Sequence, residues 1–209
     1  MRLIGCVIIS LLCCFHGNAQ EKAIILKNVN VVDVVEGSIR KGQDVVIKKG
    51  IIQAVGKGAG TGVSGEVKDL TGMYVMPGLI DAHVHIANDP KESQADRAKH
   101  LEYFLRHGVT SIRDAAGDAR VLRELKEGVQ QGKYLGPDIY YAAFMAGPAY
   151  FEGNDREKSM VEGWPEPYAP WMQCIRPDSD LDKAMEDAKE WGCTGVKIYG
   201  GFDLETLLP

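Results

Sequence analysis

Two histidines, His83 and His85, are the residues whose types and spacing point most directly to chemistry. They lie in residues 77–85, which read PGLIDAHVH, so a Pro-Gly turn precedes a short apolar run. If this run is a strand, side chains at i and i+2 point to one face, and His83, His85 and Asp81 share it. Two imidazoles on one face can bind a metal ion, and neutral imidazole suits zinc and its neighbours. The pair alone is weak evidence, because many histidines are solvated or packed in a core.

Lys197 is a second candidate, because it lies inside the apolar run of residues 195–199. A lysine in such a strand is costly unless its charge is paired or neutralised. The residue pattern alone favours a lysine whose aliphatic stem packs while its amine reaches solvent. The pattern therefore does not by itself give Lys197 a chemical role.

The elements that would position these residues alternate between strand and helix. Apolar periodicity and stop residues such as Gly108 predict strands at 79–85, 109–113, 138–143 and 194–199, and helices at 92–107, 118–131 and 180–191. Such alternation implies a parallel sheet. The connection over residues 144–180 is rich in aromatic residues and holds five of the nine prolines. Connections of this length are often functional lids.

The predicted fold is α/β. A complete (β/α)8 barrel takes about 250 residues, whereas four βα units beginning at Leu79 take up the rest of this 209-residue sequence. We therefore expect the N-terminal half of a TIM-like barrel over residues 77–209. Residues 20–76 contain several short strand patterns and a glycine-rich loop at 57–65, and we expect them to form part of a small β-sandwich.

The first nineteen residues have the pattern of a secretory signal peptide. Arg2 precedes an apolar run over residues 3–15, and small residues at Gly17 and Ala19 suggest cleavage after Ala19. The run is too short to span a bilayer as a stable helix. We expect an exported protein, periplasmic or extracellular; a lipid anchor on Cys13 or Cys14 is the alternative.

Charge and cysteine usage narrow the class of partner. Loss of residues 1–19 removes Arg2 and no acidic residue, so the net charge goes from −5 to −6. An acidic chain argues against nucleic acid or an anionic membrane surface as partner. Only Cys174 and Cys193 lie outside the leader, which allows at most one disulfide and favours ordinary core or loop residues.

The order and spacing of three segments resemble the metal-dependent amidohydrolase superfamily, in particular its imidazolonepropionase and Xaa-Pro dipeptidase-like branch. These segments are residues 70–85, residues 108–114 and residues 196–199. The resemblance implies that His83 and His85 bind one or two divalent ions, most often zinc, and that Lys197 bridges two ions as a carbamate. It implies hydrolysis of a C–N bond by water activated on the metal, with a small-molecule or dipeptide-like substrate.

The same resemblance implies further ligands that this sequence does not contain. The family completes its site with histidines from the fifth and sixth strands and an aspartate from the eighth, which serves as general base. No histidine follows His107, so we expect the general base and these ligands beyond Pro209. The alternatives are an inactive truncated product and a secreted ligand-binding module; a homo-oligomer is also open.

Four further residues are weaker candidates for the pocket or for support of a metal ligand. Asp81 would orient a metal-bound histidine, or bond locally at the barrel floor. Arg113 and Asp114 end the second strand, where they would contact substrate or pair with each other. Tyr199 shares a face with Lys197 and would line the pocket or pack in the core. His100 and His107 lie among charged helix residues and are predicted to be surface residues.

Overall fold

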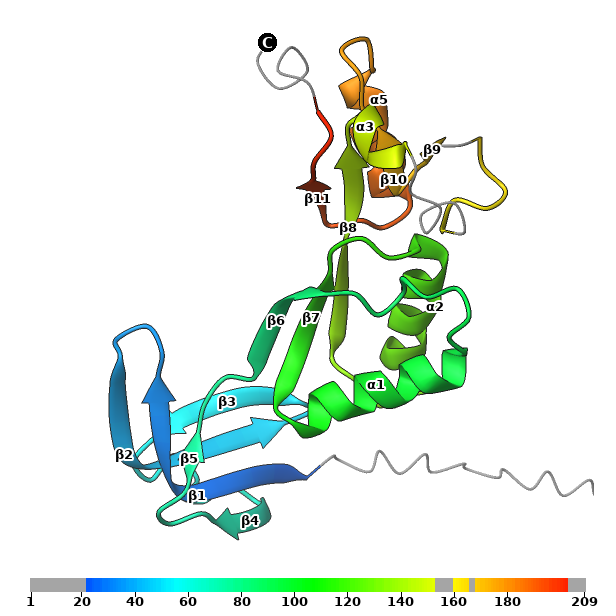
Figure 1. Ribbon diagram of the computed structural model, residues 1–209. Coiled ribbons are helices and arrows are strands. Elements are labelled where there is room, and N and C mark those ends of the chain that lie inside the picture. The colour runs from blue at the N-terminus through cyan, green and yellow to red at the C-terminus, as the bar shows by residue number, and fades with distance from the viewer. Residues whose placement is uncertain (1–21, 153–159, 166–167, 203–209) are drawn as a thin grey trace, which may run out of the picture. The chain divides into compact units, whose positions relative to one another are not determined.

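The computed structural model describes residues 22–152, 160–165 and 168–202. The predicted leader, residues 1–19, lies outside them. The chain divides after Pro77 into two compact units, which are drawn in Figure 1 and described separately here.

The first unit is a five-stranded sheet. Its order is β3-β2-β1-β4, and β5 also pairs with β1. The β1–β2 and β2–β3 pairs are antiparallel, whereas β4 and β5 run parallel to β1. Its strands are β1 (Ala23–Asp33), β2 (Ser38–Lys48), β3 (Ile51–Gly56), β4 (Gly65–Asp69) and β5 (Tyr74–Val75).

Local sequence explains most of this sheet. A tight turn joins β2 to β3, with Lys49 and Gly50 at φ of 53° and 70°. Ala23, Ile25 and Val46 pack together as its buried apolar cluster. β4 was not predicted, because only Val67 in it is a strong strand former; parallel pairing with β1 holds it in the sheet.

The second unit is a mixed α/β structure, in agreement with the predicted class. Its sheet has the order β6-β7-β8-β10-β9, and β11 also pairs with β8. The pairs β6–β7, β7–β8 and β8–β11 are parallel. The strands are β6 (Leu79–Val84), β7 (Val109–Asp114), β8 (Asp138–Ala146), β9 (Tyr168–Ala169), β10 (Met172–Cys174) and β11 (Gly195–Ile198), and the helices are α1 (Gln94–Arg106), α2 (Ala119–Gln130), α3 (Pro148–Phe151) and α5 (Leu181–Glu190).

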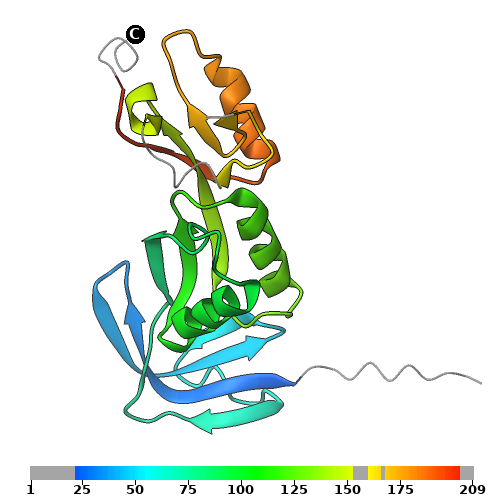
Figure 2. The same cartoon turned by 45° about the vertical axis from the view of Figure 1, so that its right-hand side comes forward.

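The long strand β8 connects the two ends of this sheet. Its first residues pair with β7, and its register with β11 begins at Ala142 and ends at Met145. Figures 1 and 2 both show β8 running from β7 toward β11. The strands β6 and β11, which are distant in sequence, therefore belong to the same sheet.

The main core of the second unit lies between this sheet and its helices. Leu101, Leu122 and Leu125 from α1 and α2 pack with Ile112 and Ile139 from β7 and β8, and each is at most 2% exposed. Burying a leucine or isoleucine contributes roughly 1.5–3 kcal/mol. The 3.6-residue apolar period of the helices was therefore a reliable guide to their buried faces.

Side-chain caps fix where these helices begin. Ser93 accepts a hydrogen bond from the Asp96 amide at the start of α1, and Asp118 and Asp180 do the same for α2 and α5. A cap of this kind contributes about 1 kcal/mol. Gly78, just before β6, is needed for a different reason: a Cβ there would lie 2.0 Å from Thr110 Oγ1.

Residues 144–180 contain more regular structure than the sequence indicated. β8 continues to Ala146, the short helix α3 follows, and β10 pairs in parallel with the end of β8. The apolar side chains that suggested a lid include Trp171 and Met172, which are buried at about 1% exposure. Much of the described part of this connection therefore belongs to the sheet and its core.

Candidate functional site

The candidate site is built around a contact between β6 and β11. Lys197 Nζ lies 3.2 Å from His83 Nε2. The rings of His83 and His85 are in edge contact, with centroids 5.1 Å apart. The structure thus brings together the three residues that sequence analysis proposed as metal ligands.

The parallel sheet explains this meeting. His83 precedes the last residue of β6, and His85 follows that strand directly. Lys197 is next to the last residue of β11 and is paired in register with Phe144 of β8. In parallel αβ folds, functional side chains collect at the carboxyl ends of the strands, and all three residues lie at such ends.

The Lys197 amine also defines the orientation of the His83 ring. The contact joins the Lys197 amine to the Nε2 side of the His83 ring. The same amine lies 4.9 Å from the centre of the Tyr199 ring, a cation–π contact.

A cavity of about 130 Å³ adjoins these residues. Its polar wall includes His85, Asn88 and Lys197. Three aromatic residues also line it: the rings of Phe144, Tyr150 and Tyr199 contact one another, with centroids 5.0–5.3 Å apart. Met160, Met172 and Ala116 complete the lining. Tyr199 thus lines a pocket, which is one of the two roles considered for it.

Two weaker candidates make local backbone contacts. Asp81 Oδ1 accepts a hydrogen bond from the backbone amide of His83 at 3.1 Å. Arg113 Nε donates to the carbonyl oxygen of Ala82 at 2.9 Å. Both side chains therefore support the β6 segment that carries the histidines, through its backbone and not through an imidazole ring.

Asp114 differs from its prediction. It was considered as a substrate contact or as the partner of Arg113, but it is fully buried and bonds to backbone amides. Its Oδ2 accepts from Ile86 N at 2.7 Å, and Oδ1 accepts from Ala116 N and Gly117 N. Adjacent strand residues point to opposite faces, which is why Arg113 is exposed while Asp114 is buried.

Sequence reasoning missed Arg97 altogether. It lies on α1 with only 5% exposure, and its guanidinium donates to backbone carbonyls in residues 86–92. In sequence it looks like one more charged residue on an amphipathic helix. His100 and His107, read as surface residues, are indeed exposed; His100 pairs with Glu92 at 3.0 Å.

The donor set fits part of a metal site. His83 and His85 offer two imidazoles in contact, and a lysine amine lies beside one of them. Within the described ranges, no group of three or more His, Cys, Asp or Glu residues is gathered as metal ligands. The residues present therefore account for two nitrogen ligands, and for an oxygen ligand only if Lys197 is carboxylated.

A larger cavity, of about 580 Å³, lies elsewhere in the second unit and contains none of these candidates. It is lined by residues of α5 and β11 such as Met185, Lys189 and Val196. Cys193 also borders it, and both Cys193 and Cys174 are free thiols. The cavity lacks the imidazoles that make the smaller site chemically distinctive.

Comparison with known proteins decides the family. Residues 74–196, more than half of the chain, match the amidohydrolase family. The chain belongs to the amidohydrolase family. Amidohydrolases generally use divalent metal ions, and the match includes both histidines and ends one residue before Lys197.

Relatives of this amidohydrolase include a dihydroorotase of Trichlorobacter lovleyi, 35% identical over 89 residues, which cover 43% of this chain and 21% of that protein. An adenine deaminase of Thermosipho melanesiensis is 30% identical over 152 residues, covering 68% of this chain and 25% of the relative. The aligned residues thus span about a quarter or less of these two proteins.

Solved structures give the same fold. A putative prolidase from Bifidobacterium longum is 26% identical with a TM-score of 0.62, over 85% of this chain and 40% of that one. A Xaa-Pro dipeptidase with methionine bound in its active site has a TM-score of 0.65 at 21% identity, over 85% and 47%. Among the described residues, no helix is long and apolar enough to cross a membrane.

Proposed function

We propose that this amidohydrolase is a metal-dependent hydrolase of C–N bonds, to which the chain contributes His83, His85 and Lys197. The observation that carries the proposal is the 3.2 Å contact between Lys197 Nζ and His83 Nε2, with the His85 ring against His83. It gathers two neutral nitrogen ligands and one carboxylatable amine at the carboxyl ends of parallel strands.

A divalent ion, zinc on the chemistry of its ligands, would supply Lewis acidity toward water and a scissile carbonyl. His83 and His85 would hold this ion through their ring nitrogens. The Lys197 ammonium group would lose one proton to become an amine, and the amine would add carbon dioxide and release a second proton, so that the resulting carbamate presents oxygen donors. One or two ions are compatible with this set.

The cavity beside the site would receive part of the substrate. Phe144, Tyr150 and Tyr199 offer apolar surface and exclude water on one side, while Asn88 offers an amide that can donate and accept hydrogen bonds. A small molecule or dipeptide-like substrate suits a cavity of this size. The similar proteins, a dihydroorotase, an adenine deaminase and a putative prolidase, support a C–N bond as the target.

The proposed barrel assigns the described strands β6, β7, β8 and β11 to the N-terminal half of a (β/α)8 fold, next to a small β-sandwich domain. The parallel order β6-β7-β8-β11 supports this assignment. In this proposal the remaining ligands and the general base belong to residues beyond Pro209. Export through a leader over residues 1–19 completes the proposal, with a lipid anchor on Cys13 or Cys14 as the variant.

Zinc binding by the purified protein tests this function. We expect residues 20–209 to bind zinc in the presence of a weak competing chelator, and His83→Ala and His85→Ala each to abolish that binding. His100→Ala is the matched control, because His100 is an exposed imidazole paired with Glu92, and it should leave binding unchanged. Zinc bound equally by all four proteins would refute the proposed site.

A further inference from the structure

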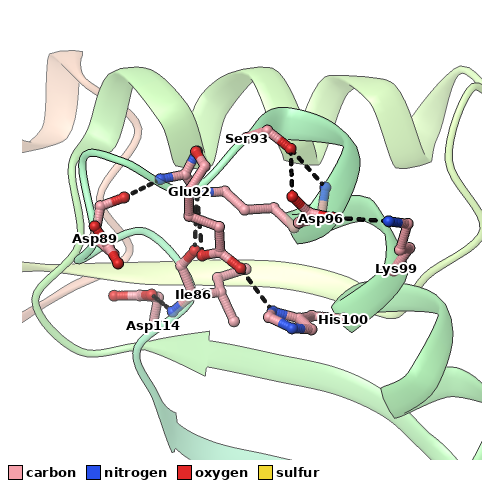
Figure 3. A network of polar contacts seen from close by, with 9 residues as sticks. Ile86, Asp89, Glu92, Ser93, Asp96, Lys99, His100 and Asp114 are labelled. Atoms are coloured by element: carbon pink, nitrogen blue, oxygen red, sulfur yellow. Dashed lines mark hydrogen bonds and ion pairs between the residues drawn. The ribbon is translucent and has the colours of Figure 1, made fainter.

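The backbone of Ile86, directly after His85, is held at its N–H and at its carbonyl oxygen by two buried charged side chains. Its N–H donates to Asp114 Oδ2 at 2.7 Å, and its carbonyl oxygen accepts from Arg97 Nε at 3.2 Å. Figure 3 shows Ile86 between Asp114 and the network that surrounds Glu92. Hydrogen bonds to charged groups are among the stronger ones in proteins.

Asp114 joins two loops at the carboxyl ends of neighbouring strands. Besides Ile86 it accepts from Ala116 N at 3.0 Å and from Gly117 N at 2.7 Å, and its own exposure is 0%. The chain packs closely here, since a Cβ on Gly117 would lie 2.9 Å from Asp114 Oδ1 and 2.8 Å from Ala87 Cβ. The carboxyl group therefore has little freedom to move without displacing the loop after β6.

Arg97 organises the rest of that loop. Its guanidinium donates to the backbone carbonyls of Ile86, Asp89 and Glu92, so residues 86–92 wrap around one buried cation. Its Nε also lies 3.7 Å from the Glu92 carboxylate. Five donors in a planar fork allow this arrangement, which a lysine could not reproduce.

We propose that Asp114 and Arg97 are positioning residues that set His85 beside His83 and Asn88 beside the cavity. The inference rests on the proposed function for its consequence, metal binding. Asp114 fixes the peptide group between His85 and Ile86, and Arg97 fixes the next one, between Ile86 and Ala87. Together they restrict the backbone of His85, and with it the place of the imidazole. Asn88 lies within the same loop and lines the cavity with His85. Neither positioning residue touches the reacting atoms.

The decisive variant is Asp114→Asn, which keeps size but can present an N–H to the N–H of Ile86. We expect it to shift the His85 ring resonances in a nitrogen–proton NMR spectrum of the metal-free protein, with those of His100 unchanged. Zinc affinity should fall roughly tenfold, as when a supporting partner of a metal ligand is lost. Arg97→Lys should also shift the His85 resonances and lower the zinc affinity, because it weakens the hold on the Ile86 carbonyl oxygen.

Asp44→Asn is the matched control. Asp44 is also buried, at 4% exposure, and accepts from two backbone amides, those of Asn28 and Gly60, in the first unit. We expect it to lower stability while leaving the His85 resonances and the zinc affinity as in the wild type. All measurements are made where circular dichroism shows each protein folded.

The outcomes separate this inference from the proposed function. Wild-type protein that binds no zinc would refute the proposed function, and the His85 resonances would still decide the positioning roles. Unchanged His85 resonances in both Asp114→Asn and Arg97→Lys would overturn the inference even if zinc binds. Should neither variant fold, hydrogen exchange of the wild-type Ile86 amide decides: exchange as fast as in a loop exposed to solvent would contradict the bond to Asp114.

Discussion

Lys197 Nζ lies 3.2 Å from His83 Nε2, although the two residues are 114 positions apart in sequence. The contact depends on β8, which pairs with β7 along its first residues and with β11 farther on. One strand thus sets the relation between the histidine-bearing and the lysine-bearing strands.

Lys197→Ala should lower metal occupancy, because it removes the amine that would become an oxygen ligand. A short carboxylic acid such as acetate or propionate should restore part of the occupancy by entering the space left by the side chain. Metal content after gel filtration measures both effects. Lys99→Ala, an exposed lysine paired with Asp96, is the control; equal metal content in Lys197→Ala and wild type would exclude the ligand role.

Residues 20–209 alone should show no turnover of dipeptides or cyclic amides, even when zinc is bound. The proposal takes its general base from an aspartate of the eighth barrel strand, which is not among the strands that the structure describes, and Asp114 is committed to backbone amides. A panel assay with and without chelator measures this. Turnover that both chelator and His83→Ala abolish would show that the described residues suffice for catalysis.

Much of this fold could be predicted from the amino-acid sequence. Apolar periodicity predicted the helices α1, α2 and α5 to within about two residues of their bounds. β10 escaped prediction, because Met172–Cys174 is too short to show a period, and its pairing with β8 is a tertiary effect. Long, periodic elements were thus predictable where short ones were not.

The site was predictable only in part. The spacing of His83 and His85 was weak evidence by itself, and the family resemblance supplied the predicted metal-binding roles of both histidines and of Lys197. Asp114 was read as a substrate contact or as the partner of Arg113, because a strand-end aspartate looks the same in sequence whether it faces solvent or backbone. The small residues that follow it, which include Ala116 and Gly117, were the available signal, since aspartate often accepts amides two or three residues ahead.

Exposed apolar edge residues should cause self-association. Among the described strands, β6 pairs only with β7, and β11 only with β8, while Ile80 and Ile198 are 73% and 60% exposed. Unpaired edges with apolar side chains favour pairing with other chains. We expect dimers or larger species of residues 20–209 by size-exclusion chromatography with light scattering.

The double variant Ile80→Lys/Ile198→Lys should shift that protein toward monomer, because charged residues on an edge oppose pairing. Val35→Lys is the control, since Val35 is 87% exposed but lies outside the strands; it should leave the size distribution unchanged. A wild-type protein that is monomeric and unfolds cooperatively would contradict the importance of these edges.

Stability should decline in alkali in part through Cys193. Burial raises the pKa of the Cys193 thiol from its ordinary value of 9.0 to about 12. Above pH 9 the unfolded chain releases this proton and the folded chain retains it. The Cys193 thiol therefore makes its full contribution to the free energy of unfolding below pH 9, and this contribution is lost as the pH rises toward 12.

Denaturant unfolding between pH 8 and 11 measures that effect. In Cys193→Ala the free energy of unfolding should decline less steeply with pH than in the wild type, whatever the effect of the substitution on stability at pH 8. Cys174→Ala should flatten this decline less, because burial raises the pKa of Cys174 by a smaller amount. An unchanged pH slope in Cys193→Ala would show that the Cys193 thiol is not shielded from solvent in the folded protein.

The most direct test of the central claim is the position of zinc in a crystal of the zinc-loaded protein, located by anomalous diffraction at the zinc edge. The account predicts a peak at bonding distance, about 2.0–2.1 Å, from a ring nitrogen of each of His83 and His85, with the Lys197 side chain directed to the same ion. A fully loaded crystal with its zinc on other residues, such as His100 and Glu92, would contradict the assignment of this site.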